Sequence, residues 1–232
     1  MNESAVVQRR RSPKGEQRRR EILVAAGDVF AQGGFDSASL AEIAQKAGIT
    51  QAGLLHHYPS KNALLFAVLD NREVVEDDSA AGGDAGTSST EEAHGVGFLI
   101  AFLTALRRHE QDPSETAFFS ILSTESVTPT HPAHAYFLNR YKSVPRDMNL
   151  ELERVFDAAK LPPKTSIFDL SRTLIAIADG MRIQWLFEPD AVVRSELVAR
   201  HLELLEPYMR DGVRDEFRSA LARWRMPADA TN

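Results

Sequence analysis

The segment from Ser39 to Leu64, SLAEIAQKAGITQAGLLHHYPSKNAL, contains two short helix patterns separated by a single glycine turn. Ser39 and Glu42 have the S-x-x-E spacing of a capping box, in which two side chains satisfy free backbone N–H groups at the start of a helix. Gly48 follows the last apolar residue of this pattern, where a glycine commonly ends a helix. The first helix is therefore short, and its apolar residues are Leu40, Ile43, Ala44 and Ala47.

A second short helix begins directly after that turn. Thr50 is a residue type that caps helices, and Pro59 prevents the helix that starts at Gln51 from continuing much beyond His57. Two helices of this length with a glycine-containing turn are typical of the helix-turn-helix, whose second helix enters the major groove of DNA. A plain α-helical hairpin inside a bundle has the same spacing, so the pattern alone leaves both interpretations open.

Helical spacing also dominates the rest of the 232-residue chain, and no run alternates in the manner of a strand. A helix over 15–32 stops at Gly33-Gly34, and Ser60 can cap another helix after Pro59. The glycine- and serine-rich stretch from 77 to 90 predicts a linker. The fold class is therefore all-α. The remaining helices are expected at 91–109, 114–126, 133–159, 165–188, 191–210 and 212–225.

Composition and motifs exclude several classes of function. The chain has no cysteine, and neither a Gly-rich phosphate loop nor a G-x-S-x-G motif occurs in it. His131 and His134 have a His-x-x-His spacing, but no carboxylate pattern accompanies them, so we expect no metal. The longest apolar run, 96–106, is far shorter than the roughly 20 residues of a membrane helix. We expect a cytoplasmic protein that is not an enzyme and binds no cofactor, metal or membrane.

Charge is distributed unevenly along the chain. Residues 1–61 contain 9 basic and 6 acidic residues, whereas the remainder contains 18 basic and 27 acidic ones. The segment from Arg9 to Arg20, RRRSPKGEQRRR, concentrates seven cations around a single acid. A run of this kind is either a solvated tail or a contact with nucleic acid. The two parts of the chain are thus expected to meet different partners.

The residues after the turn favour the helix-turn-helix. ITQAGLLHHYPSKNALLFAVL, with the lead-in GFDSASLAEIAQKAGIT, resembles the signature of the tetracycline-repressor (TetR) family: a recognition helix, a His-Tyr end, and Ser-Lys opening the next helix. The resemblance extends over roughly Glu16 to Leu69. It implies an N-terminal DNA-binding domain over 1–62, with a basic arm at 1–14 and the helix-turn-helix at about 39–57. It also implies a larger C-terminal helical domain over 63–232 for effector binding and dimerisation.

The resemblance implies a set of DNA contacts as well. Gln51 would face base edges, where it can form a bidentate pair with adenine, and Ala52 could touch a thymine methyl group. Leu55 departs from the family, which often has a phosphate-binding tyrosine there, so we expect the basic arm to supply part of the missing attraction to phosphate. The other implied contacts are Ser39, Thr50, Gly53, His56, Tyr58 and Lys61, with Lys61 clamping the DNA backbone.

In the C-terminal part, the resemblance implies a homodimer through helices at about 165–188 and 191–210. Apolar residues occupy two faces of the first of these helices, which implies two packing partners, although both faces could belong to the monomer core. The helices between 91 and 159 then form a pocket for a small-molecule effector. Candidate contacts for that ligand are Phe102, Phe118, Glu125, His134, Phe137, Asp179 and Trp185, although aromatic residues at helical spacing are often plain core.

We therefore expect a dimeric transcriptional regulator, a repressor rather than an activator, that binds a palindromic DNA operator. An apolar or amphipathic small molecule would release it. The alternatives are a protein that binds DNA without sequence preference and a helical interaction module that has no effector. The three differ in whether binding to duplex DNA is sequence-specific, only salt-dependent, or absent.

Overall fold

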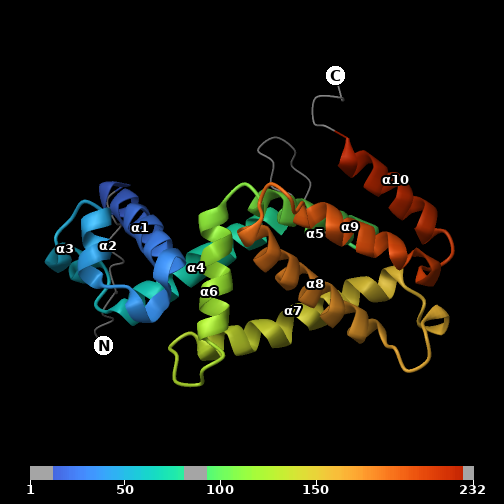
Figure 1. The fold of residues 1–232 in the computed structure, drawn as a ribbon, viewed down its shortest axis with the longest axis horizontal. Helices are drawn as coiled ribbons and strands as arrows, with labels where there is room; N and C mark the ends of the chain where they lie inside the picture. Colours follow the sequence, from blue (N-terminus) through green and yellow to red (C-terminus); the bar gives the residue numbers. More distant parts are fainter. Residues whose placement is uncertain (1–12, 81–92, 227–232) are drawn as a thin grey trace, which may run out of the picture.

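The computed structural model describes residues 13–80 and 93–226, and within these ranges the chain is built from α-helices (Figure 1). Across the described ranges, one isolated antiparallel bridge, between Phe156 and Met209, is the only β-type pairing. The predicted all-α class is confirmed. None of the described helices is both long and apolar enough to cross a membrane. They are α1 (Pro13–Ser37), α2 (Leu40–Lys46), α3 (Gln51–His57), α4 (Lys61–Ala80), α5 (Val96–His109), α6 (Pro113–Glu125), α7 (His134–Val155), α8 (Ile167–Phe187), α9 (Arg194–Leu204) and α10 (Val213–Arg225), with 3-10 helices η1 (Ala158–Lys160) and η2 (Glu206–Tyr208).

The helix-turn-helix forms where its capping residues predict it. The Ser39 hydroxyl accepts a hydrogen bond from the backbone N–H of Glu42, and the Thr50 hydroxyl accepts one from that of Gly53, both at 3.1 Å. These bonds satisfy N–H groups that have no partner inside the helix, so α2 and α3 begin within a residue of their predicted starts. Helix α1 is longer than predicted, because the chain resumes a helical turn after a kink at Gly34.

Several predicted boundaries in the remainder are wrong. Residues 77–80, assigned to the linker, extend α4, while residues 81–90 of that stretch and residues 1–12 of the basic arm lie outside the described residues. Helix α5 begins at Val96 rather than at 91. Helix α7 ends at Val155 because Phe156 adopts extended backbone and pairs with Met209. Helix α9 ends at Leu204, shortly before Pro207, which cannot continue an α-helix.

Buried apolar side chains form two clusters. The first core contains side chains of α1 to α4 together with Phe118 and Leu122 of α6 and Phe137 of α7. The second core joins α5, the C-terminal part of α7, and α8 to α10. Figure 1 shows α1 to α3 at one end of the molecule and α6 between that end and the other helices. The first core therefore crosses the predicted domain boundary at residue 62.

Helix α6 is fastened to α1 by both polar and aromatic contacts. The Glu125 carboxylate accepts a hydrogen bond from the backbone N–H of Phe35 at 2.8 Å, next to the kink at Gly34. At the other end of the contact, the Ser114 hydroxyl donates to the Asp28 carboxylate at 3.0 Å. Between them, the ring of Phe118 lies 6.4 Å from that of Phe30, centre to centre. A displacement of α6 would therefore be transmitted to α1.

Replacement of Gly34 by alanine tests this contact between α1 and α6. Gly34 has φ 78° and ψ −177°, a conformation almost restricted to glycine, and a Cβ at this position would collide with the Glu125 carboxylate. We expect Gly34→Ala to lower the free energy of unfolding by about 3 kcal/mol or more, from backbone strain plus a weakened charged hydrogen bond.

Gly48→Ala is the matched control. Gly48 also has positive φ, at 65°, but a Cβ there would meet no atom within 4 Å. It should cost only about 1 to 2 kcal/mol of strain in a urea titration. Equal losses in the two variants would contradict the collision with Glu125.

Candidate DNA-binding surface and ligand pocket

One face of α3 is open to solvent. Gln51, Ala52, Leu55 and His56 are exposed, and their spacing places them on one side of the helix. Leu54 is fully buried in the first core, which fixes the rotation of α3 about its axis. Three of the predicted DNA contacts are therefore presented outward, together with Leu55.

Ser39, Thr50 and Gly53 lie at the starts of α2 and α3. Both hydroxyls are exposed, and each accepts one backbone N–H while keeping its own proton to donate. Gly53 is half-buried, and a Cβ there would come within 3.3 Å of the Thr50 hydroxyl oxygen. A phosphate beside these helix ends could accept a hydrogen bond from either hydroxyl, as predicted.

Tyr58 and Lys61, two further predicted DNA contacts, are engaged within the protein. Tyr58 is only 3% exposed and belongs to the first core. The Lys61 ammonium donates to the backbone carbonyls of Phe35 at 2.7 Å, Ala38 at 2.9 Å and Asp36 at 3.3 Å. These bonds use all three of its protons, so Lys61 fastens α4 to the segment after α1.

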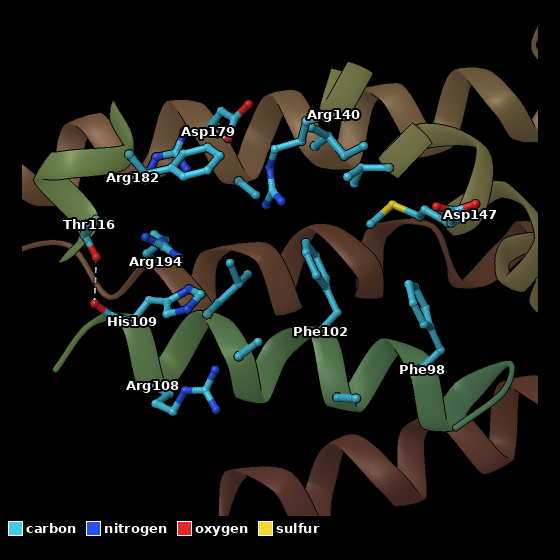
Figure 2. Close-up of a pocket in the computed structure, with 18 of the residues that line it drawn as sticks. Phe98, Phe102, Arg108, His109, Thr116, Arg140, Asp147, Asp179, Arg182 and Arg194 are labelled. Atoms are coloured by element: carbon cyan, nitrogen blue, oxygen red, sulfur yellow. Dashed lines mark hydrogen bonds and ion pairs between the residues drawn. The ribbon is translucent and has the colours of Figure 1, made fainter. Parts of the chain in front are cut away.

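A cavity of about 330 Å³ lies in the C-terminal part, between α5, α6, α7 and α8, with the start of α9 at one end (Figure 2). Apolar side chains form much of its wall, among them Phe98 and Phe102 of α5. In Figure 2, Arg182, Arg194 and His109 are drawn together at the opposite end from Phe98. Apolar walls with a few convergent polar groups are typical of small-molecule sites.

Two of the seven predicted ligand contacts, Phe102 and Asp179, line this cavity. Phe118 and Phe137 belong to the first core instead, and the face of α6 that carries Phe118 packs against α1. Trp185 is buried on α8 but does not line the cavity. These three predictions are corrected: the aromatic rings are core residues.

The other two corrections concern polar side chains that hold the end of α6 and the loop after it. Glu125 is occupied by the backbone of Phe35, as described above. His134 donates through Nδ1 to the backbone carbonyl of Ser126 at 2.8 Å, and His131 Nδ1 lies 2.9 Å from the Ser126 hydroxyl. The His-x-x-His pair thus organises this loop. No group of three or more side chains suited to a metal occurs in the described ranges.

The residues that sequence reasoning missed are the polar ones at the charged end of the cavity. Arg182 donates to Asp179 at 2.8 Å, and the Tyr141 hydroxyl donates to the same carboxylate at 2.9 Å. The three-residue spacing from Asp179 to Arg182 on α8 was a usable signal for this pair. Arg194 and His109 had no such signal, because their burial is decided by the packing of α9 against α5.

Two side chains at the charged end of the cavity, Arg194 and His109, have lowered pKa values. Burial, and then the neighbouring charge of Arg182, lowers the pKa of Arg194 to about 10, so this guanidinium remains charged at neutral pH. Burial also lowers the pKa of His109 to about 4, with further contributions from Arg194, Arg108, Arg182 and Arg140. His109 is therefore neutral at pH 7 and in the midst of positive charge.

The pKa of His109 predicts a loss of stability in acid. Because its pKa is about 4 in the folded chain and about 6.5 when unfolded, the unfolded state binds more protons as the pH falls from 6.5 to 4. We expect wild-type protein to lose about 2 kcal/mol more stability between pH 7 and pH 4.5 than His109→Asn, as measured by urea unfolding. His56→Asn, at an exposed histidine, is the control and should lose as much as wild type. A His109→Asn variant with the wild-type pH dependence would show the expectation to be wrong.

Comparison with known proteins identifies the N-terminal part. Residues 22–68 match the family model described as bacterial regulatory proteins, tetR family. The transcriptional regulator RutR of Escherichia coli K12 is 43% identical over 67 residues, which cover 29% of this chain and 31% of RutR. The chain therefore matches about a third of the length of this curated relative.

Two further similarities extend over the C-terminal part. The transcriptional regulator TtgR of Pseudomonas putida is 23% identical over 187 residues, 79% of this chain and 87% of TtgR. SmeT, the repressor of a Stenotrophomonas maltophilia multidrug efflux pump, has the same fold in its triclosan complex, with a TM-score of 0.65, 19% identity, and coverage of 85% of this chain and 94% of SmeT. Residues 22–68 are therefore similar to the DNA-binding segment of the tetR family of bacterial regulatory proteins, and the fold over 85% of the chain is similar to that of SmeT.

Proposed function

We propose that this protein is a homodimeric repressor, without catalytic activity, that binds a palindromic operator in the cytoplasm through the exposed face of α3. A small molecule that enters the cavity between α5 and α8 releases it from DNA. One observation carries the proposal: α6 contributes to both sites. Thr116 and Phe119 line the cavity, while Phe118 and Leu122 of the same helix complete the core under the helix-turn-helix.

The relatives support the direction of regulation and the kind of effector. SmeT is described as a repressor, and one of its structures is a complex with triclosan, a small molecule. RutR supports the DNA-binding activity, because it is described as an HTH-type transcriptional regulator. A repressor that is released from DNA by a small molecule is consistent with each of these descriptions.

Helix α6 offers a physical route between the two sites. A ligand that displaces Thr116 or Phe119 would shift α6, and the bonds of Glu125 and Ser114 to α1 would pass that shift to the helix-turn-helix. In a dimer, a small rotation of each DNA-binding end changes the distance between the two recognition helices, which must match successive major grooves about 34 to 36 Å apart. A coupling free energy of about 1 to 3 kcal/mol would weaken operator binding about 5- to 150-fold.

The proposed dimer interface lies on α8 and α9, which pack against each other. Leu170 and Leu174 of α8 and Val198 of α9 face the second core, so one side of each helix is already occupied. Large apolar side chains nevertheless remain exposed on the same two helices and their connection. Such a group marks a surface for association in a soluble chain. Its members are Ile183, Phe187, Val193, Leu197 and Leu204.

Selection of bound sequences from a random duplex pool tests DNA recognition. We expect a palindrome that binds more tightly than a scrambled duplex at two salt concentrations. Gln51→Ala should relax the preference at one base of each half-site, with a loss of about 1 to 3 kcal/mol of discrimination for that base. Gln32→Ala, at an exposed glutamine on α1, is the control and should leave the preference unchanged. Equal, salt-sensitive binding to both duplexes would instead indicate a nonspecific DNA-binding protein.

A charge placed on the exposed apolar surface tests the dimer. Phe187 is 81% exposed, so Phe187→Glu should scarcely affect folding of one chain but should desolvate a carboxylate in the dimer. We expect this variant to elute as a monomer in size-exclusion chromatography with light scattering and to lose operator binding. Val127→Glu, at a position 75% exposed outside α8 and α9, is the control and should remain dimeric. A dimeric Phe187→Glu variant would contradict the proposed interface.

A further inference from the structure

Arg194 has unused hydrogen-bonding capacity inside the cavity. It is the first residue of α9 and is 2% exposed, yet its Nε and Nη1 have no hydrogen-bond partner within the described ranges. The same is true of Nε of Arg182. Buried polar groups are nearly always paired, and those on charged side chains are the costliest to leave unpaired. These three buried nitrogens, on two guanidinium groups, call for an acceptor.

Carboxylates of the protein nearby are committed elsewhere. Glu110 accepts hydrogen bonds from the backbone N–H and the hydroxyl of Ser195, the latter at 3.0 Å. Asp179 accepts from Tyr141 and from a different nitrogen of Arg182. The charges of Glu110 and Asp179 raise the pKa of Arg194 and so partly offset the effect of burial. Within the described ranges, however, Arg194 forms no hydrogen bond to either carboxylate. Within the described residues, the charge of Arg194 is therefore only partly compensated.

The cavity has the two ends that an amphipathic molecule requires. Figure 2 shows Arg194 between Arg182 and His109 at one end, with Phe102 farther along α5 and Phe98 beyond it. Burial is the main cause of the low pKa of His109, and the charges of Arg194 and three other arginines lower it further, so the first end of the cavity is positively charged. The volume of about 330 Å³ is near the lower limit of ligand pockets, so the molecule is small.

We propose that this cavity binds a small amphipathic organic acid, with its carboxylate on Arg194 and Arg182 and its apolar body against Phe98 and Phe102. The assignment deepens the proposed function and rests on it for the ligand's role as effector. A neutral molecule of the same shape would exclude water from the three unpaired nitrogens of Arg194 and Arg182 without replacing it, whereas a carboxylate supplies the missing acceptors. The charged end thus selects for an anion, and the apolar end for its body.

Binding of matched acids and amides tests the proposal. Isothermal titration of the full chain, without DNA, would compare 2-naphthylacetate with 2-naphthylacetamide, and 4-phenylbutanoate with 4-phenylbutanamide. We expect each acid to bind about 10- to 100-fold more tightly than its amide to wild-type protein. Arg194→Met should reduce the acid to the affinity of the amide while leaving the amide unchanged. Arg194→Lys should give an intermediate ratio, because it keeps the charge but not the planar fork.

Arg200→Met is the control variant. Arg200 is on the same helix but is exposed, and it pairs with Glu196 outside the cavity. Its acid-to-amide ratio should equal that of wild type. Without ligand, Arg194→Met should unfold at the same or a higher temperature than wild type, because it removes a buried and incompletely paired charge. If Arg194→Met does not fold, the wild-type comparison and the Arg194→Lys variant still decide the question.

The outcomes separate this inference from the proposed function. If neither acid binds wild-type protein more tightly than its amide, or if the ratio does not depend on residue 194, the anion site is wrong. Operator release is measured separately, by fluorescence anisotropy of the selected duplex. An acid that binds through Arg194 but leaves operator binding unchanged supports the site and overturns the role of this cavity in releasing DNA.

Discussion

The packing of α6 against α1 is the contact on which the rest of the molecule depends. The apolar core of the four N-terminal helices includes Phe118 and Leu122, which come from the C-terminal part. The bond from the Phe35 N–H to Glu125 fixes this arrangement at a point where the kink at Gly34 leaves a backbone donor without a helical partner. The end of the molecule with the helix-turn-helix is consequently continuous in packing with the end that holds the cavity.

Under our proposals, this shared helix gives regulation a simple physical basis. One face of α6 lines the cavity and the other packs under the helix-turn-helix, so a ligand and an operator would both influence the position of the same helix. At the charged end of the cavity, cationic groups are buried without a full set of hydrogen-bond acceptors, which costs free energy. Under our proposals, an anionic ligand offsets that cost and α6 moves in response.

Sequence reasoning succeeded where local chemistry decides the structure. Caps at Ser39 and Thr50 depend on residues three positions away, so α2 and α3 could be predicted closely. The contacts that Lys61 makes within the protein could not be predicted in this way. A lysine at a helix start looks free, and only the approach of the chain around Phe35 converts it into a donor to three carbonyls. Tyr58 likewise belongs to the core because of what packs over it.

By itself, the sequence determined the helical class, the helix-turn-helix and its exposed residues, because periodicity, caps and glycine turns act over a few residues. Tertiary structure alone decided which side chains meet at the cavity. Phe102 and Asp179 reach it, whereas Phe118 and Glu125 face α1, although aromatic and acidic residues look alike along a helix. The burial of Arg194 depends on how α9 docks on α5 and α8, a long-range arrangement that no local pattern encodes.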